Sequence, residues 1–164
     1  MVWRRLNGTN DLKGRINDAK ALSGLMTDLS GHPVTPNDML NRLQFVAESK
    51  FDSVYVCEEG GKILGLLGFR IRENLEDVSK FGEVSALVVN AKEKRRGVGR
   101  FMMDYVEKLA RELGCKGTWL VSGFAREKEA HLFYKQLGYQ QTGYRFVKLV
   151  DNSGGRLNPP PSNG

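Results

Sequence analysis

The chain has 164 residues and a formal net charge of +6, and 40% of its residues are hydrophobic and 27% charged. This composition is that of an ordinary globular protein and excludes collagen-like, low-complexity and wholly disordered chains. It contains no apolar run of about 20 residues, the length that a bilayer-spanning helix needs. Two cysteines and two histidines are too few for a disulfide scaffold, a four-cysteine zinc site or a histidine-rich metal site, so we expect no metal.

Apolar residues at helical spacing predict two helices in the first third of the chain. The first has Asp18 as its N-cap and stops at Gly31, and Thr35-Pro36 opens the second. Further along, alternating apolar residues and glycine-containing turns predict a hairpin and then strands and helices in alternation. The predicted elements are strands 53–57 and 62–72, strand 83–89, helix 98–113, strand 118–122, helix 127–137 and strand 144–150.

This order of elements predicts a mixed α/β sheet and differs from the regular alternation of a Rossmann fold. We expect one domain over residues 18–150. Residues 1–17 have weak periodicity and are predicted to be an N-terminal extension. Residues 151–164 contain Ser-Gly-Gly and three consecutive prolines without a periodic apolar face, so we expect a disordered C-terminal tail.

A glycine-containing basic loop precedes the longest predicted helix. Gly97 and Gly99 lie where that helix begins, and between residues 92 and 100 five basic side chains outnumber one acidic side chain, a local charge of +4. Unpaired backbone N–H groups and the helix dipole favour an anion at such a position, and glycine lets the anion come close. The basic residues are Lys92, Lys94, Arg95, Arg96 and Arg100. The pattern predicts a site for a diphosphate.

Other interpretations of this loop have less support. A P-loop needs Gly-Lys-Ser/Thr, but Arg100 follows Gly99, and a dinucleotide fingerprint needs a glycine where Met102 stands. A nucleic-acid surface commonly interleaves aromatic residues with the positive charge, and this loop has none. A solvated basic helix start without a ligand stays open as the alternative.

Two segments resemble the GNAT acyltransferase superfamily. Arg95-Arg96-Gly97-Val98-Gly99-Arg100, preceded by Leu87-Val88-Val89, is similar to its acetyl-CoA motif, with Lys94 in place of the usual Gln or Arg at the first motif position. Ala130-His131-Leu132-Phe133-Tyr134, continuing to Gly138-Tyr139, is similar to its second conserved helix. The resemblance covers about residues 19–150 and implies a GNAT-like fold: a mostly antiparallel sheet, splayed at one parallel strand pair and flanked by helices.

The resemblance also implies which residues bind acetyl-CoA, the acetyl donor. Backbone groups of Leu87, Val88 and Val89 would contact the pantetheine arm, much as an added strand contacts a sheet edge. Glu127 stands where many family members carry an Asn that contacts the same arm. The residues expected to hold the diphosphate are Arg95, Arg96, Gly97, Val98, Gly99 and Arg100.

Acyl transfer to an amine needs a neutral amine and a proton for the leaving thiolate. The resemblance places the Tyr134 hydroxyl near the sulfur, so Tyr134 is the candidate acid; its alternative role is that of a core aromatic. Glu83 is the candidate base, acting through water, and its alternative is a solvated carboxylate. Strict alternation places Glu83 on one strand face with Ser85, Leu87 and Val89 unless a bulge shifts the register.

Together with these residues, the resemblance implies an N-acetyltransferase that moves acetyl from acetyl-CoA to a primary amine of a small molecule by direct attack in a ternary complex, and we expect a cytoplasmic location. We expect a monomer or homodimer, with no nucleic acid and no membrane as partner. The acceptor pocket is expected between the turn at residues 30–35 and the last strands. Alternatives are a protein N-terminal or lysine acetyltransferase, a CoA-binding module without turnover, and, more weakly, a nucleic-acid-binding module.

Overall fold

The computed structural model describes residues 1–6, 12–123 and 130–150, in two compact units, 1–121 and 122–164, that are treated separately. Unit 1 consists of β1 (Val2–Arg5), α1 (Leu12–Ser30), α2 (Pro36–Glu48), β2 (Asp52–Glu59), β3 (Lys62–Glu73), β4 (Lys80–Val89), the 3-10 turn η1 (Ala91–Glu93), α3 (Val98–Glu112) and β5 (Gly117–Leu120). In unit 2 the described helix is α4 (Leu132–Gln136). Within the described ranges no helix is long and apolar enough to cross a membrane, and no group of three or more His, Cys, Asp or Glu side chains could hold a metal ion.

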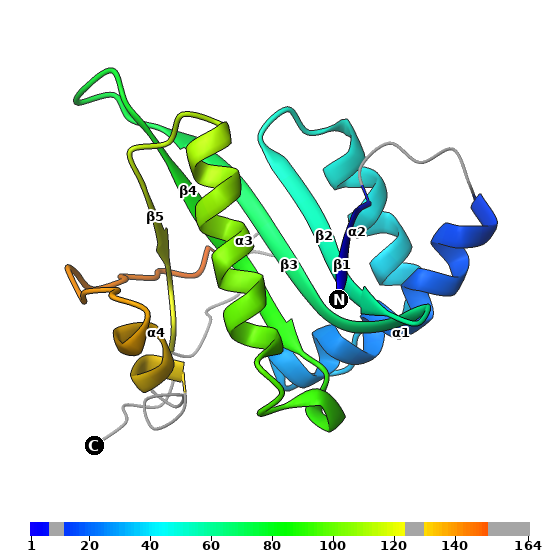
Figure 1. Cartoon of the computed structure of the whole chain (residues 1–164). Helices are drawn as coiled ribbons and strands as arrows, with labels where there is room; N and C mark the ends of the chain where they lie inside the picture. The colour runs from blue at the N-terminus through cyan, green and yellow to red at the C-terminus, as the bar shows by residue number, and fades with distance from the viewer. Residues whose placement is uncertain (7–11, 124–129, 151–164) are drawn as a thin grey trace. The chain divides into compact units, whose positions relative to one another are not determined.

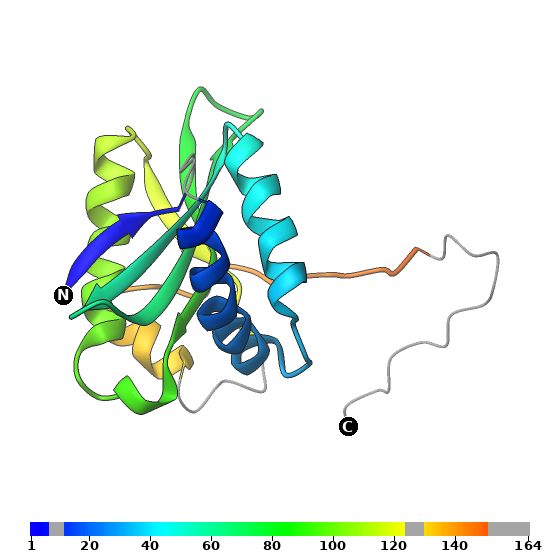
Figure 2. The ribbon, with the colours of Figure 1, turned by 90° about the vertical axis from the view of Figure 1, so that its right-hand side faces the viewer.

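The strands of unit 1 form one five-stranded sheet in the order β1-β2-β3-β4-β5 (Figure 1). Neighbouring strands are antiparallel except for β4 and β5, which are parallel. Helix α3 covers one face of the sheet, and α1 and α2 cover the other (Figure 2). The predicted mixed α/β fold, a mostly antiparallel sheet with one parallel pair, is confirmed.

Each face of the sheet has its own apolar core. On the face of α1 and α2, Leu22, Leu25 and Leu43 pack with Leu66 and Val88 of the sheet. On the other face Met102 of α3 lies so close to β3 that a Cβ on Gly65 would be 2.7 Å from its Sδ atom. A Cβ at position 65 would also be 2.8 Å from the Val88 carbonyl oxygen, so a larger residue there would disturb the packing between α3 and the sheet.

The predicted starts of α2 and α3 are confirmed. At the start of α2 the Thr35 hydroxyl accepts a hydrogen bond from the Asp38 N–H (3.1 Å), and the Asp38 carboxylate accepts one from the Thr35 N–H (3.0 Å). This capping box gives both backbone N–H groups a hydrogen-bond partner that the helix itself does not provide. Helix α3 begins at Val98, as predicted, and its buried residues repeat at helical spacing.

The N-terminal residues differ from the prediction. Residues 2–5 form β1, which pairs along β2, and α1 begins at Leu12, so Asp18 is not its N-cap. Asp18 instead accepts two hydrogen bonds from the Arg4 guanidinium, at 2.7 and 3.0 Å, and Arg4 also binds Glu58. The indole of Trp3 stacks on the Tyr105 and Phe101 rings of α3, with centroid distances of 4.3 and 5.5 Å.

We predict that Trp3→Ala lowers the free energy of unfolding by about 2 kcal/mol, because it removes a large half-buried ring from two aromatic contacts. The denaturant midpoint measures the loss. Phe45→Ala is the control, since the Phe45 side chain is 61% exposed and should lose less than about 0.5 kcal/mol. Equal effects of the two substitutions would mean that β1 does not stabilise the unit.

The C-terminal prediction is only partly met. Of the helix predicted over 127–137, residues 127–129 lie outside the described residues, and α4 covers Leu132–Gln136. The predicted strand over 144–150 is wrong: these residues are in no strand, and their large apolar side chains are exposed. Alternation provides the propensity, but a strand forms only with a hydrogen-bonded neighbour. The predicted tail, 151–164, lies outside the described residues.

Candidate active site

The basic loop between β4 and α3 has an unusual backbone. Arg95 has φ of +64° and Gly97 φ of +79°, so two residues within three positions are in the left-handed region. Arginine is uncommon there, and such conformations gather at functional sites. A turn of this kind makes a concavity lined by backbone N–H groups, which suits an anion.

The start of α3 adds further donors to the loop. Gly97 is its N-cap and provides no side-chain cap, and the first N–H to bond within the helix is that of Phe101, to the Gly97 carbonyl at 3.0 Å. The N–H groups of Val98, Gly99 and Arg100 therefore precede the intrahelical ladder. The Val98 side chain is buried, which fixes this turn on the sheet, while Gly97 and Arg100 are exposed. A Cβ on Gly97 would meet no atom within 4 Å, so there is open space over the loop.

The buried carboxylate of Glu93 holds the loop in place through two ion pairs. Only 5% of this residue is exposed, and its carboxylate accepts hydrogen bonds from Lys62 Nζ at 2.5 Å and from Arg96. Arg96 also donates to Glu59 Oε2 at 2.9 Å, which ties the loop to the β2–β3 turn. Hydrogen bonds from Lys62 and Arg96 lower the pKa of Glu93, and hydrogen bonds to Glu93 and Glu59 raise the pKa of Arg96.

This network separates the predicted arginines into two groups. The Arg96 guanidinium is held by two carboxylates, so we expect it to position the loop, whereas the side chains of Arg95 and Arg100 are exposed. Glu93, Lys62 and Glu59 were not predicted as residues of the site. Their contacts join residues 31 and 37 positions apart in the chain, and no local pattern reports such pairs.

We predict that Glu93→Gln lowers the melting temperature by several degrees near neutral pH, because the neutral amide binds Lys62 and Arg96 less strongly. Since the folded pKa of Glu93 lies below its ordinary value of 4.5, the stability from its ionised form is complete above that pH. It is lost as the pH falls through the folded pKa. The difference in melting temperature from the original protein should therefore shrink below about pH 4.5.

Glu107→Gln is the matched control, since it removes an exposed pair with Arg111 (3.5 Å) and should change the melting temperature little at any pH. A Glu93→Gln difference that persists unchanged into acid would contradict the role given to the Glu93 charge.

Next to the loop, β4 extends beyond the end of its parallel partner β5. The last paired residues are Val84 of β4 and Leu120 of β5, whereas β4 continues to Val89. Leu87, Val88 and Val89 are thus on a stretch of β4 that pairs with β3 but has no described strand on its other edge. Half of the backbone polar groups of this stretch point to that edge, where an extended chain with amide groups could pair.

A bulge in β4 reverses the predicted face of Glu83. Leu87 pairs with Leu67 and Glu83 with Arg70, and the register shifts by one residue between them, at Ser85. Because Leu67 and Arg70 are three positions apart on β3, they lie on opposite faces of the sheet. Glu83 therefore does not share a face with Leu87 and Val89, which is the outcome expected for a bulge and not for strict alternation. The Glu83 carboxylate is 16% exposed and accepts from Arg72 Nε at 2.5 Å.

Tyr134 belongs to unit 2. It lies in α4 and is half-buried, with its ring in contact with Phe133 and edge-on to Tyr139, at centroid distances of 5.3 and 5.9 Å. Its carbonyl accepts from the N–H groups of Leu137 and Tyr139, which closes the end of the helix. Glu127, the other predicted residue of this segment, lies outside the described residues.

Comparison with known proteins identifies the family to which the chain is similar. The profile of the Acetyltransferase (GNAT) family matches residues 23–139. The chain is 30% identical over 90 residues to an aminoalkylphosphonate N-acetyltransferase from Salmonella typhimurium, an alignment that covers 55% of this chain and 58% of that protein.

Among solved structures, the fold is similar to that of a GNAT family acetyltransferase from Staphylococcus aureus, with a TM-score of 0.76, 23% identity and coverage of 91% of this chain and 98% of that one. It is also similar to the aminoglycoside N-acetyltransferase AAC(6′)-Iy in complex with CoA, with a TM-score of 0.72, 17% identity and coverage of 92% and 94%. At these identities the likeness concerns the fold.

Proposed function

Because the chain belongs to the GNAT family of acetyltransferases, we propose that it transfers an acetyl group from acetyl-CoA to a primary amine of a small molecule, by direct attack in a ternary complex. The observation that carries this proposal is the loop before α3, where left-handed Arg95 and Gly97 lead into a helix start with unpaired N–H groups. We also propose a cytoplasmic location and a monomer or homodimer.

The loop and the open edge of β4 fit the two halves of acetyl-CoA, which supplies the acetyl group as an activated thioester. The N–H groups of the turn and of Val98, Gly99 and Arg100 would bind the diphosphate, with Arg95 and Arg100 adding charge. Leu87, Val88 and Val89 would pair through their backbone with the amides of the pantetheine arm. The solved relative that contains CoA supports this assignment at the level of the fold.

Proton transfer is assigned to two side chains. An alkylamine has a pKa near 10, so the acceptor must lose a proton before it attacks, and Glu83 would accept this proton through a water molecule. Tyr134 would donate its hydroxyl proton to the departing thiolate. A backbone N–H near Val89 would polarise the thioester carbonyl oxygen.

A small-molecule acceptor agrees with the name of the Salmonella relative, which acts on an aminoalkylphosphonate. Thermal shift with acetyl-CoA, followed by an amine panel assayed for thiol release, tests the proposal. We expect a concentration-dependent rise in melting temperature and thiol release with small amines. A rise without release from any amine would favour a CoA-binding module, and release only with peptides would favour a protein acetyltransferase.

A further inference from the structure

A row of charged side chains crosses the sheet near the paired ends of β4 and β5. The strand registers pair Asp52 with Arg70, Arg70 with Glu83, and Glu83 with Trp119, from β2 to β5. Directly paired residues share a face, so these four side chains lie on one face in the order acid, base, acid, aromatic. All four belong to unit 1.

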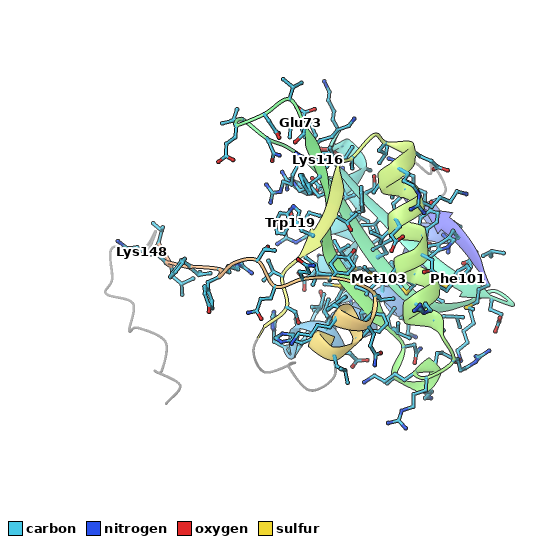
Figure 3. The ribbon with its side chains drawn as sticks, turned by 60° about the vertical axis from the view of Figure 1, so that its left-hand side comes forward. Glu73, Phe101, Met103, Lys116, Trp119 and Lys148 are labelled. Carbon is cyan, nitrogen blue, oxygen red and sulfur yellow. The ribbon has the colours of Figure 1, made fainter. Side chains whose placement is uncertain are left out.

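The row lies on the face of α1 and α2. Gly65 faces Met102 of α3, and Arg70 is five positions further along β3, hence on the other face. Trp119 on β5 accordingly points away from α3 (Figure 3). The apolar core under α1 and α2 includes Leu66 and Val88 but does not extend to the row. The sheet is polar at this row, and the side chain of Arg70 is 38% exposed and Trp119 36% exposed.

The guanidinium groups of Arg70 and Arg72 are only partly occupied by carboxylates. Arg72 donates from Nε to Glu83 at 2.5 Å, and its side chain is 47% exposed, while Arg70 Nη1 lies 3.5 Å from Asp52 Oδ1 and its side chain is 38% exposed. A guanidinium has five N–H donors, and among the described contacts Arg72 uses one of them. The carboxylates of Asp52 and Glu83 are much less exposed, at 16% each. At this place the sheet therefore presents two partly exposed guanidinium groups, each beside a carboxylate that is less exposed.

We propose that Arg72, with Arg70 beside it, is a specificity-determining residue that binds an anionic group at the far end of the acceptor amine. This inference rests on the proposed function and defines its substrate class: primary amines that also carry a phosphonate, phosphate or carboxylate. Guanidinium groups bind such oxyanions through paired, charge-assisted hydrogen bonds. The ammonium end of the same molecule is complementary to Glu83, which the proposed mechanism makes the proton acceptor.

The spacing of the row suits a short zwitterion. Adjacent strands are about 4.8 Å apart, and two residues along a strand span about 7 Å. Glu83 is directly paired with Arg70 and is in contact with Arg72, so an amine and an acid joined by two or three carbons could reach the carboxylate and a guanidinium together. The partly exposed Trp119 ring completes the row with an apolar surface for that alkyl chain.

The test compares kcat/KM for 2-aminoethylphosphonate, for β-alanine and for uncharged propylamine, in the original protein and in Arg72→Gln. We expect the original protein to prefer at least one anionic amine over propylamine by about tenfold or more, and Arg72→Gln to reduce that ratio by about tenfold through a higher KM. Whichever of 2-aminoethylphosphonate and β-alanine has the higher kcat/KM shows whether phosphonate or carboxylate is the recognised group. Arg111→Gln, on the exposed side of α3, is the matched control and should keep the ratio.

Arg72→Lys separates charge from geometry, because lysine keeps the charge but loses the planar fork, so the ratio should fall partway. It also serves if Arg72→Gln fails to fold. Equal losses for charged and uncharged amines, or an unchanged ratio in both Arg72 variants, would overturn the inference. So would an original protein that acetylates propylamine as well as the acids, although the proposed function would then stand. Absence of transfer to every amine would overturn the proposed function and this inference with it.

Discussion

Replacing Tyr134 by Phe is expected to lower kcat by about a hundredfold or more while leaving the melting temperature close to that of the original protein. The substitution removes one hydroxyl group and keeps the ring that packs against Phe133 and Tyr139. If that hydroxyl donates the proton to the leaving thiolate, its loss affects the transition state and not the binding of acetyl-CoA. We therefore expect kcat to fall with little change in the affinity for CoA.

Tyr139→Phe is the matched control for this experiment. Tyr139 is half-buried, lies edge-on to Tyr134 and loses the same group in the substitution, but the mechanism gives its hydroxyl no role. Its kcat should stay within about twofold of the original value. Turnover that is unchanged in Tyr134→Phe, or that falls equally in both variants, would remove Tyr134 from the proposed proton transfer.

Gly97→Val should weaken CoA binding by about tenfold to a hundredfold. Gly97 has φ of +79°, where a side chain costs about 1–2 kcal/mol and a β-branched one more. The turn would relieve this strain by changing its backbone, and the N–H groups that line the concavity would then point elsewhere. The added Cβ meets no neighbouring atom within 4 Å, so a steric effect on the folded core is not the cause.

Gly114→Val provides the comparison, because Gly114 is just past the other end of α3, with φ of +68°, and its Cβ would meet only Lys80 Cε at 3.8 Å. Both variants should lose similar stability, whereas only Gly97→Val should lose affinity for CoA in a titration at a temperature where both are folded. Equal affinities in the two variants would contradict the role of the Gly97 turn.

The parts of the fold with local determinants could be predicted from the sequence. The Thr35–Asp38 capping box specifies the start of α2, and the apolar stripe that begins at Val98 specifies α3, because both depend on residues three or four positions apart. The position of the basic loop before α3 follows from the same helix. The left-handed conformation of Arg95 in this loop could not be predicted in the same way, since arginine rarely adopts it.

The parts that were missed depend on contacts between distant residues. Strand β1 has only four residues, and its Trp3 packs against the rings of Phe101 and Tyr105 on α3, about a hundred positions away in the chain. The bulge at Ser85 is visible only in the register between β3 and β4, and it moves Glu83 to the face of Arg70 and Arg72. Conversely, the alternation over 144–150 predicted a strand that the structure does not contain, because no described strand pairs with it.

Calorimetric titration tests the central claim most directly, namely that the main-chain amides of the turn at Arg95–Gly97 and of the first turn of α3 hold a diphosphate. CoA should bind with a saturable heat at micromolar to millimolar concentration and bind more weakly as salt is added. Pantetheine, which lacks the diphosphate, should produce no comparable heat. An absence of heat from CoA at millimolar concentration, or equal binding of CoA and pantetheine, would contradict the account.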